Sequence, residues 1–212
     1  MCIRDRHDHA DQILKETLIK IKKFYPSIKF CQWFLDKMDD KKWKVNRQRF
    51  EKIISHMDAS FCTTHPSSIK SLKGKNVKYI PNPVDKNFEN LKIYENKSYK
   101  YDLFFALSHG VHRGTLKKGK VDLRETFLNK LIAMTKEIRF NLYGINDKQP
   151  VWAENFKNEL NKSKMALNLS QGDPLKFYSS DRIAQLVGNG ILTFVEKKTK
   201  LNKLFNLSLI HI

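Results

Sequence analysis

Several polar residues that could bind an anion follow an apolar run near the C-terminus. The run at 165–169 gives way to a polar loop, and a helix-like segment then carries Lys176, Ser179, Ser180 and Arg182. Backbone N–H groups in the first turn of a helix lack internal partners and attract phosphate, while Lys and Arg side chains add charged donors. These residue types in this order predict a diphosphate site. The alternative is structural: the polar residues cap the helix, and the arginine pairs with a nearby aspartate.

Gln185 lies about one helical turn beyond Arg182, on roughly the same face of that helix. Its amide could bond a hydroxyl of a ribose or sugar attached to the diphosphate. Two carboxylates nearby, Asp173 and Asp181, could in principle serve as acid and base. Helix and loop capping explains both of them, so no catalytic residue is assigned.

A second candidate for phosphate binding is the segment S-H-G-V-H-R-G-T-L-K-K-G-K at 108–120. Gly110 allows close approach of the backbone, and Arg113 and Lys118 supply donors; the planar fork of arginine suits a diphosphate. The end of the segment fits the G-x-x-x-x-G-K pattern of a P-loop, but Val121 stands where the Ser or Thr that holds Mg²⁺ is required. A P-loop NTPase and a solvated basic loop remain alternatives.

The histidines and cysteines show no metal-ligand spacing. His109 and His112 lack the flanking Glu of a zinc helix, and Cys2, Cys31 and Cys62 form no C-x-x-C pair. We therefore expect no bound metal, no disulfide framework and a reducing compartment. The chain also lacks a long apolar span and an apolar leader segment, which predicts a cytoplasmic protein.

The chain has 212 residues and a formal net charge of +18, a balance that often indicates an anionic partner. The basic excess is spread over both halves, and the chain is rich in Lys, Asn and Ile, as proteins from AT-rich genomes are. This distribution argues against nucleic acid as a partner, although a basic nucleic-acid-binding α/β protein stays an alternative. Peripheral contact with the anionic inner face of a membrane is also open.

Short apolar runs alternate with amphipathic segments, which predicts an α/β protein with parallel sheets covered by helices. We expect strands at 28–35, 59–63, 77–80, 101–107, 139–143, 165–169 and 191–195, and helices at 11–25, 49–57, 123–135, 151–160 and 177–187. Ligands of such sheets bind beyond the carboxyl ends of the strands. Both predicted phosphate loops start at such ends.

Residues 86–100 carry little hydrophobic periodicity and many Lys and Asn, so we expect a linker there. It would separate a partial N-terminal α/β domain at 7–85 from a C-terminal α/β domain at 101–206. Residues 1–6 and 207–212 resemble translated adapter sequence, and we expect both ends to be foreign to the fold.

The order of these segments resembles the two-domain glycosyltransferases of the GT-B type, and most of all their CgeB-like, glycosyltransferase family 1-like branch. V-K-Y-I-P-N-P-V-D at 77–85 is similar to the end of the N-terminal domain, and 108–120 stands where that fold has its donor-phosphate loop. N-L-Y-G at 141–144 matches a strand and its glycine. Residues 165–194 are similar to the donor-binding strand, loop, helix and G-x-G.

The resemblance implies Rossmann-like parallel sheets in a GT-B two-domain architecture, with the N-terminal domain incomplete. It implies a metal-independent enzyme, without a cofactor, that transfers a sugar from a nucleotide-sugar donor. The acceptor would be a glycan, a lipid-linked group or a protein. The residues that would bind the donor diphosphate are Gly110, Arg113, Lys118, Lys176, Ser179, Ser180 and Arg182. Gln185 would bind the ribose or the sugar.

The sequence departs from that family at two positions. Many members have Glu where Gln185 stands, and retaining members have two Glu residues eight apart, which would fall at Phe177 and Gln185. Because the pair is absent, the resemblance does not extend to the retaining mechanism. A glycosyltransferase-like domain that only binds its ligand is a further alternative.

Overall fold

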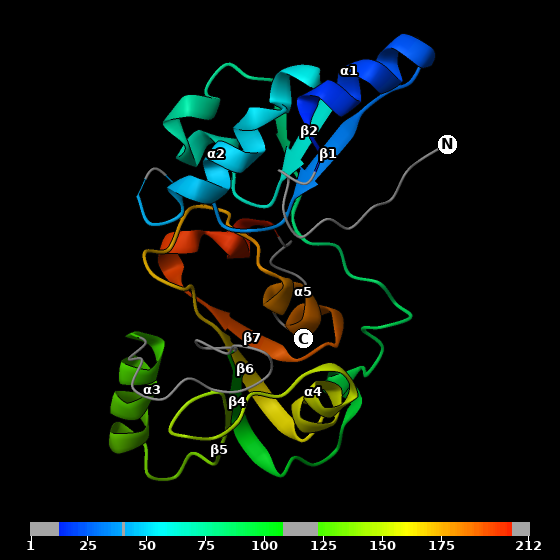
Figure 1. Ribbon diagram of the computed structural model, residues 1–212. Coiled ribbons are helices and arrows are strands. Elements are labelled where there is room, and N and C mark those ends of the chain that lie inside the picture. Colours follow the sequence, from blue (N-terminus) through cyan, green and yellow to red (C-terminus); the bar gives the residue numbers. More distant parts are fainter. Residues whose placement is uncertain (1–12, 40, 108–122, 205–212) are drawn as a thin grey trace. The chain divides into compact units, whose positions relative to one another are not determined.

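The structure is a computed structural model that describes residues 13–39, 41–107 and 123–204. The chain divides into two compact units. One comprises Met1–Asn82 and Leu175–Ser180, and the other comprises Pro83–Pro174 and Asp181–Ile212. Each unit contains one parallel β-sheet (Figure 1). The expected α/β class with parallel sheets is therefore confirmed.

The sheet of the first unit has the strand order β1-β2-β3, with all strands parallel. Its strands are β1 (Cys31–Phe34), β2 (Ala59–Cys62) and β3 (Val77–Tyr79). The helices are α1 (Lys15–Phe24), α2 (Lys44–Lys52) and short 3-10 helices at Ile54–His56, Pro66–Ser68 and Lys70–Leu72. Cys62 is in register with Phe34 and with Tyr79, so the three strands end at the same edge of the sheet.

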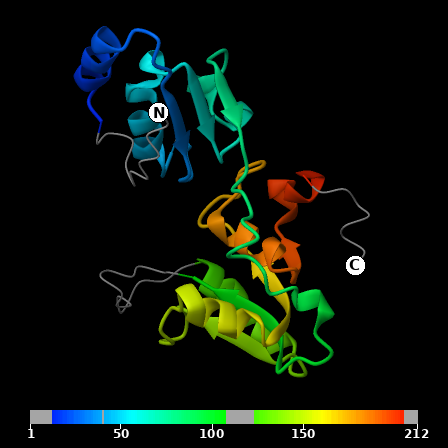
Figure 2. The same ribbon diagram turned by 90° about the vertical axis from the view of Figure 1, so that its right-hand side faces the viewer.

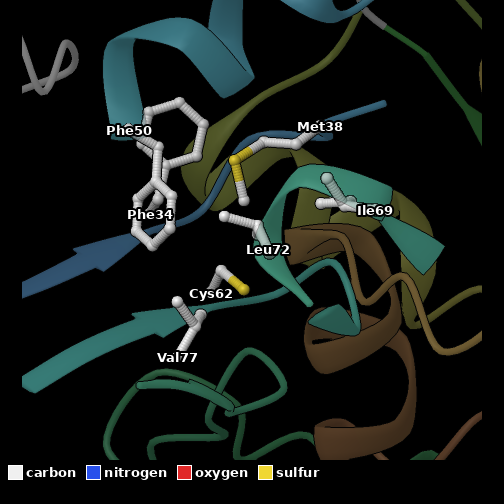
Figure 3. Packing of buried hydrophobic residues seen from close by; sticks show 7 residues of the cluster. All are labelled: Phe34, Met38, Phe50, Cys62, Ile69, Leu72 and Val77. Carbon is white, nitrogen blue, oxygen red and sulfur yellow. The ribbon is translucent and has the colours of Figure 1, made fainter. Parts of the chain in front are cut away.

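A hydrophobic cluster joins this sheet to α2 and to the segments around it (Figure 3). Its buried members are Phe34, Met38, Phe50, Cys62, Ile69, Leu72 and Val77. The ring of Phe50, on α2, lies 5.8 Å from the ring of Phe34, centroid to centroid. Burial raises the pKa of the Cys62 thiol to about 12. The thiol is therefore protonated at neutral pH and serves as a packing group.

The sheet of the second unit has the strand order β5-β4-β6-β7, again with all strands parallel. Its strands are β4 (Tyr101–Ala106), β5 (Phe140–Tyr143), β6 (Ser163–Asn168) and β7 (Leu192–Val195). The helices are α3 (Leu123–Met134), α4 (Ala153–Leu160), α5 (Asp181–Gly188) and short 3-10 helices at Ile93–Glu95, Lys197–Thr199 and Leu201–Leu204.

Helices cover both faces of this second sheet (Figure 2), and β4 is buried on both sides. Phe104 packs in one cluster with Leu160 of α4 and Leu186 of α5. The next residue, Phe105, packs in a different cluster with Leu128 of α3. Because successive side chains of a strand point to opposite faces, a doubly covered strand needs an unbroken apolar run. The run L-F-F-A-L that begins at Leu103 meets this requirement.

The strand order of the second sheet reverses between β4 and β6. From β4 the chain passes through α3 to β5, and it then returns through α4 to β6, on the other side of β4. The segments that follow β4 and β6 therefore lead to helices on opposite faces of the sheet, α3 and α5. In open parallel sheets, ligands bind at this reversal, beyond the carboxyl ends of the strands.

Residues 86–100, where composition suggests a linker, lie in the second unit. Ile93 is 1% exposed and belongs to the core of that unit, and its carbonyl accepts a hydrogen bond from the hydroxyl of Tyr99. Asn189, at the end of α5, holds the same stretch. Its side-chain oxygen accepts the N–H of Leu91 at 3.2 Å, and its carbonyl accepts the N–H of Ile93 at 2.9 Å.

Each expected strand and helix is present, but two helices are displaced along the chain. The helix expected at 49–57 begins already at Lys44. The carboxylate of Asp39 accepts the backbone N–H groups of Lys41, at 2.8 Å, and of Trp43, at 2.7 Å. These two bonds form a turn directly before α2. The turn explains why the helix begins at Lys44 and not at residue 49.

The helix expected at 177–187 begins later, at Asp181. Phe177 has a φ of 55°, in the left-handed region, which a right-handed helix cannot contain. Residues 175–180 belong to the first unit, and they contact it as a turn and not as a helix. The expectation that a helix starts near Lys176 is therefore wrong.

Candidate functional site

Arg182 lies at the carboxyl ends of β4 and β6. Its Nη1 atom donates a hydrogen bond to the carbonyl oxygen of Leu169, 3.0 Å away and directly after β6. Its guanidinium carbon lies 5.0 Å from the ring centroid of Phe105, near the end of β4. These two contacts orient the guanidinium, a planar group with five N–H donors, at the point where the strand order reverses. The side chain is half-buried, so its charge acts in a medium less polar than water.

Gln185 lies on α5, one turn after Arg182, as the spacing predicts. Its side chain is exposed. The buried residues of the helix are Ile183, Ala184 and Leu186. The second unit therefore places Arg182 and the exposed amide of Gln185 on the same helix.

Ser179 is buried and bonded to the first unit through three of its atoms. Its N–H donates to the carbonyl oxygen of Thr63 at 3.0 Å. Its hydroxyl oxygen accepts the N–H of Asn82 at 3.1 Å, and its carbonyl accepts the side-chain amide of Asn82 at 2.9 Å. These bonds fix the segment 175–180, which carries Lys176 and Ser180. The residues that the sequence groups together are thus divided between the units, with Arg182 and Gln185 in the second.

Lys176 stands next to a cluster of rings at the carboxyl ends of β2 and β3. The rings of Tyr79 and Phe177 lie 5.2 and 5.4 Å from that of His65, and the Lys176 amine lies 5.1 Å from the Phe177 ring centroid. Burial, and secondarily the charge of Lys176, lowers the pKa of His65. The imidazole is therefore neutral at pH 7, and its Nδ1 accepts the backbone N–H of Ser67.

The other expected phosphate-binding residues, Gly110, Arg113 and Lys118, lie outside the described residues, as does Val121. The donor-phosphate loop and the alternative P-loop therefore both stay predictions.

Two polar residues that the sequence did not single out lie at the carboxyl edge of the second sheet. The carboxylate of Glu196, directly after β7, accepts the backbone N–H of Ser170, in the loop after β6. Asn168 ends β6 and is 6% exposed, and its side-chain oxygen has no hydrogen-bond donor within the described part of the chain. Glu196 could have been identified from the sequence, because it directly follows the strand expected at 191–195.

Two further classes of site find no support in the structure. Among the residues it describes, no group of three or more His, Cys, Asp or Glu side chains is arranged to hold a metal ion. Within the same ranges, every helix is too short or too polar to cross a membrane.

Part of the second half of the chain matches a model of one protein family. Residues 124–209 match a family model described as glycosyl transferase-like. This range contains α3 except its first residue, all of α4, α5 and β5 to β7, and with them Arg182, Gln185 and Glu196. No match to a curated protein or to a solved structure was found. The match supports a role in glycosyl transfer, which requires a sugar donor and an acceptor.

Proposed function

We propose that this chain is part of a GT-B-type glycosyltransferase of the CgeB-like branch, which transfers a sugar from a nucleotide-sugar donor. The observation that carries the proposal is the position of Arg182, at the reversal of strand order and within the range that matches the glycosyl transferase-like family. A cation fixed at that point fits a ligand with a diphosphate group.

Arg182 would stabilise the leaving group of the reaction. When the bond between the sugar and the diphosphate breaks, negative charge develops on the nucleoside diphosphate. A guanidinium already oriented by Leu169 and Phe105 offsets this charge without reorganisation and without a metal ion. Loss of one such preorganised donor typically slows a reaction by about a hundredfold or more.

The other expected donor-binding residues have subordinate roles in this proposal. Lys176 and Ser180 would add a charge and a hydroxyl near the diphosphate, and Gln185 would bond the ribose or the sugar. Ser179 would act by fixing the segment that carries Lys176 and Ser180, since its own atoms bond Thr63 and Asn82. We further propose that Gly110, Arg113 and Lys118 also bind the diphosphate.

The acceptor in this proposal is a glycan, a lipid-linked group or a protein. The proposed enzyme works in the cytoplasm, and its net charge of +18 favours contact with the anionic inner face of a membrane. The first unit would be the N-terminal, acceptor-side domain of the proposed two-domain architecture.

The test is thermal unfolding of the chain with UDP, GDP, CDP, ADP and ATP, each with and without Mg²⁺. At about a hundred times its Kd, a ligand that binds only the folded protein adds about 2.7 kcal/mol to the free energy of unfolding. We expect one nucleoside diphosphate to stabilise the chain without Mg²⁺, and Arg182→Ala to abolish the effect.

Arg139→Ala is the matched control, because Arg139 precedes β5 at the opposite edge of the same sheet and pairs there with Asp102. This variant should keep the nucleotide effect. Stabilisation by ATP alone, and only with Mg²⁺, would favour a P-loop NTPase. No stabilisation of a folded chain by any of the diphosphates would contradict the proposal.

A further inference from the structure

Glu196 places a carboxylate next to the loop that follows β6. The residue comes directly after β7, and its side chain reaches across to accept the N–H of Ser170. Asn168 and Val195 are paired in the sheet, so β6 and β7 end at the same level. The carboxylate therefore lies at the carboxyl edge of the sheet, on the side of β6 away from β4.

The chain from β6 to Glu196 forms a βαβ unit. One charged residue, Arg182, lies at the start of its helix, and another, Glu196, directly follows its second strand. In nucleotide-binding units of this kind, the diphosphate lies between the first strand and the start of the helix. An acidic residue at the carboxyl end of the second strand accepts hydrogen bonds from the ribose hydroxyls. Here Arg182 occupies the first position, at the start of α5, and Glu196 occupies the second.

A second hydrogen-bond acceptor lies at the same edge. The side-chain oxygen of Asn168 is buried without a donor in the described part of the chain, and a buried acceptor of this kind is costly unless a ligand or a water molecule supplies one. Asn141 also has a buried oxygen without a described donor, but its amide bonds Ser163, the first residue of β6, away from this edge.

Asn168 and the Glu196 carboxylate are close neighbours. Ser170, which the carboxylate contacts, follows Asn168 by two residues, a span of about 7 Å at most. Two acceptors beside the same loop suit a ligand group that donates two hydrogen bonds, and a pair of adjacent hydroxyls is such a group.

We infer that Glu196 accepts hydrogen bonds from the ribose hydroxyls of the donor nucleotide, with Asn168 as a second acceptor, directly or through a water molecule. The inference rests on the proposed function and extends it from the diphosphate to the nucleoside. In this inference the charged contact with the ribose comes from Glu196, at the end of β7. The residue that α5 offers for such a contact, Gln185, is neutral.

The experiment compares ribonucleotides with deoxyribonucleotides. The Kd of the nucleoside diphosphate that stabilises the chain, and that of its 2′-deoxy counterpart, are measured by calorimetry on the unchanged protein, Glu196→Ala and Glu196→Gln. A hydrogen bond to a charged group predicts that the unchanged protein binds the ribose form about tenfold or more tightly. Glu196→Ala should bind both forms as weakly as the unchanged protein binds the deoxy form. Glu196→Gln, which keeps a neutral acceptor, should be intermediate.

The matched control is Glu137→Ala, which removes an exposed carboxylate between α3 and β5 and should keep the preference for ribose. Equal binding of both forms by the unchanged protein would overturn the inference and leave the proposed function standing. So would equal weakening of both forms in Glu196→Ala, because the carboxylate would then act only by holding Ser170. If no nucleoside diphosphate binds the folded chain, the proposed function and this inference both fail.

Discussion

Two arginines of the second unit differ in the groups that their side chains contact. Arg182 contacts a carbonyl oxygen and an aromatic face, and these two contacts orient its guanidinium. Arg139, directly before β5, instead pairs with a carboxylate. Its guanidinium donates two bonds to the carboxylate of Asp102, at 2.9 and 3.0 Å. The Asp102–Arg139 pair fastens β4 to the start of β5.

The Asp102–Arg139 pair predicts a dependence of stability on acid. Hydrogen bonds from the side chain and backbone of Arg139 lower the pKa of Asp102 from 3.8 to about 2 in the folded protein. Because the folded pKa is the lower one, the stabilisation is complete above about pH 4 and is lost as the pH falls toward 2. We expect Asp102→Asn to be less stable than the unchanged protein at pH 6, with the difference shrinking below pH 4. The effect should be small, since the pair is largely solvated.

Urea unfolding at a series of pH values between about 2 and 6 measures this difference. Asp85→Asn is a suitable control, because Asp85 is exposed and its carboxylate accepts the backbone N–H of Asn87, two residues on, and so joins no separate strands. A constant gap between Asp102→Asn and the unchanged protein at every pH would show that the carboxylate does not act through its charge.

At the scale of elements, most of the fold follows from local sequence patterns. The strand from Tyr101 is an apolar run because both of its faces are covered, and α5 is amphipathic because one of its faces is buried. The start of α5 could not be predicted in the same way. Residues 175–180 have a helical pattern, but the bonds of Ser179 to Thr63 and Asn82 join positions about a hundred residues apart. Such contacts override local propensity.

The candidate site was predictable to a similar degree. The types and order of Arg182 and Gln185 indicated a helix that binds a diphosphate, and the structure places both on α5. Glu196 could have been found from its position after an expected strand. Asn168 could not, because an unpaired buried oxygen is a property of the surroundings and not of the residue type.

The turn after α5 predicts that a side chain at Gly190 lowers the free energy of unfolding more than one at Gly172. Its φ is +73°, and an added Cβ would lie 2.5 Å from the ring of Tyr94. Gly172 has a similar φ of +66°, but nothing lies within 4 Å of its Cβ position. We expect Gly172→Ala to cost about 1 kcal/mol of unfolding free energy, from backbone strain alone. Gly190→Ala should cost about 2 kcal/mol more, from overpacking. Equal losses in urea unfolding would show that Tyr94 moves aside freely.

At the scale of the whole molecule, the net charge of +18 predicts how the proposed contact with a membrane would form. A charge spread along the chain attracts an anionic surface without a specific headgroup site, and salt screens it within a Debye length of about 10 Å at 0.1 M and 3 Å at 1 M. We expect sedimentation with phosphatidylglycerol and phosphatidylserine vesicles alike at low salt, none at about 1 M salt, and none with phosphatidylcholine.

Phe24, which is 77% exposed next to several lysines, provides the contrast. If binding survived high salt and Phe24→Ser abolished it, insertion of apolar side chains and not diffuse charge would hold the protein to the membrane.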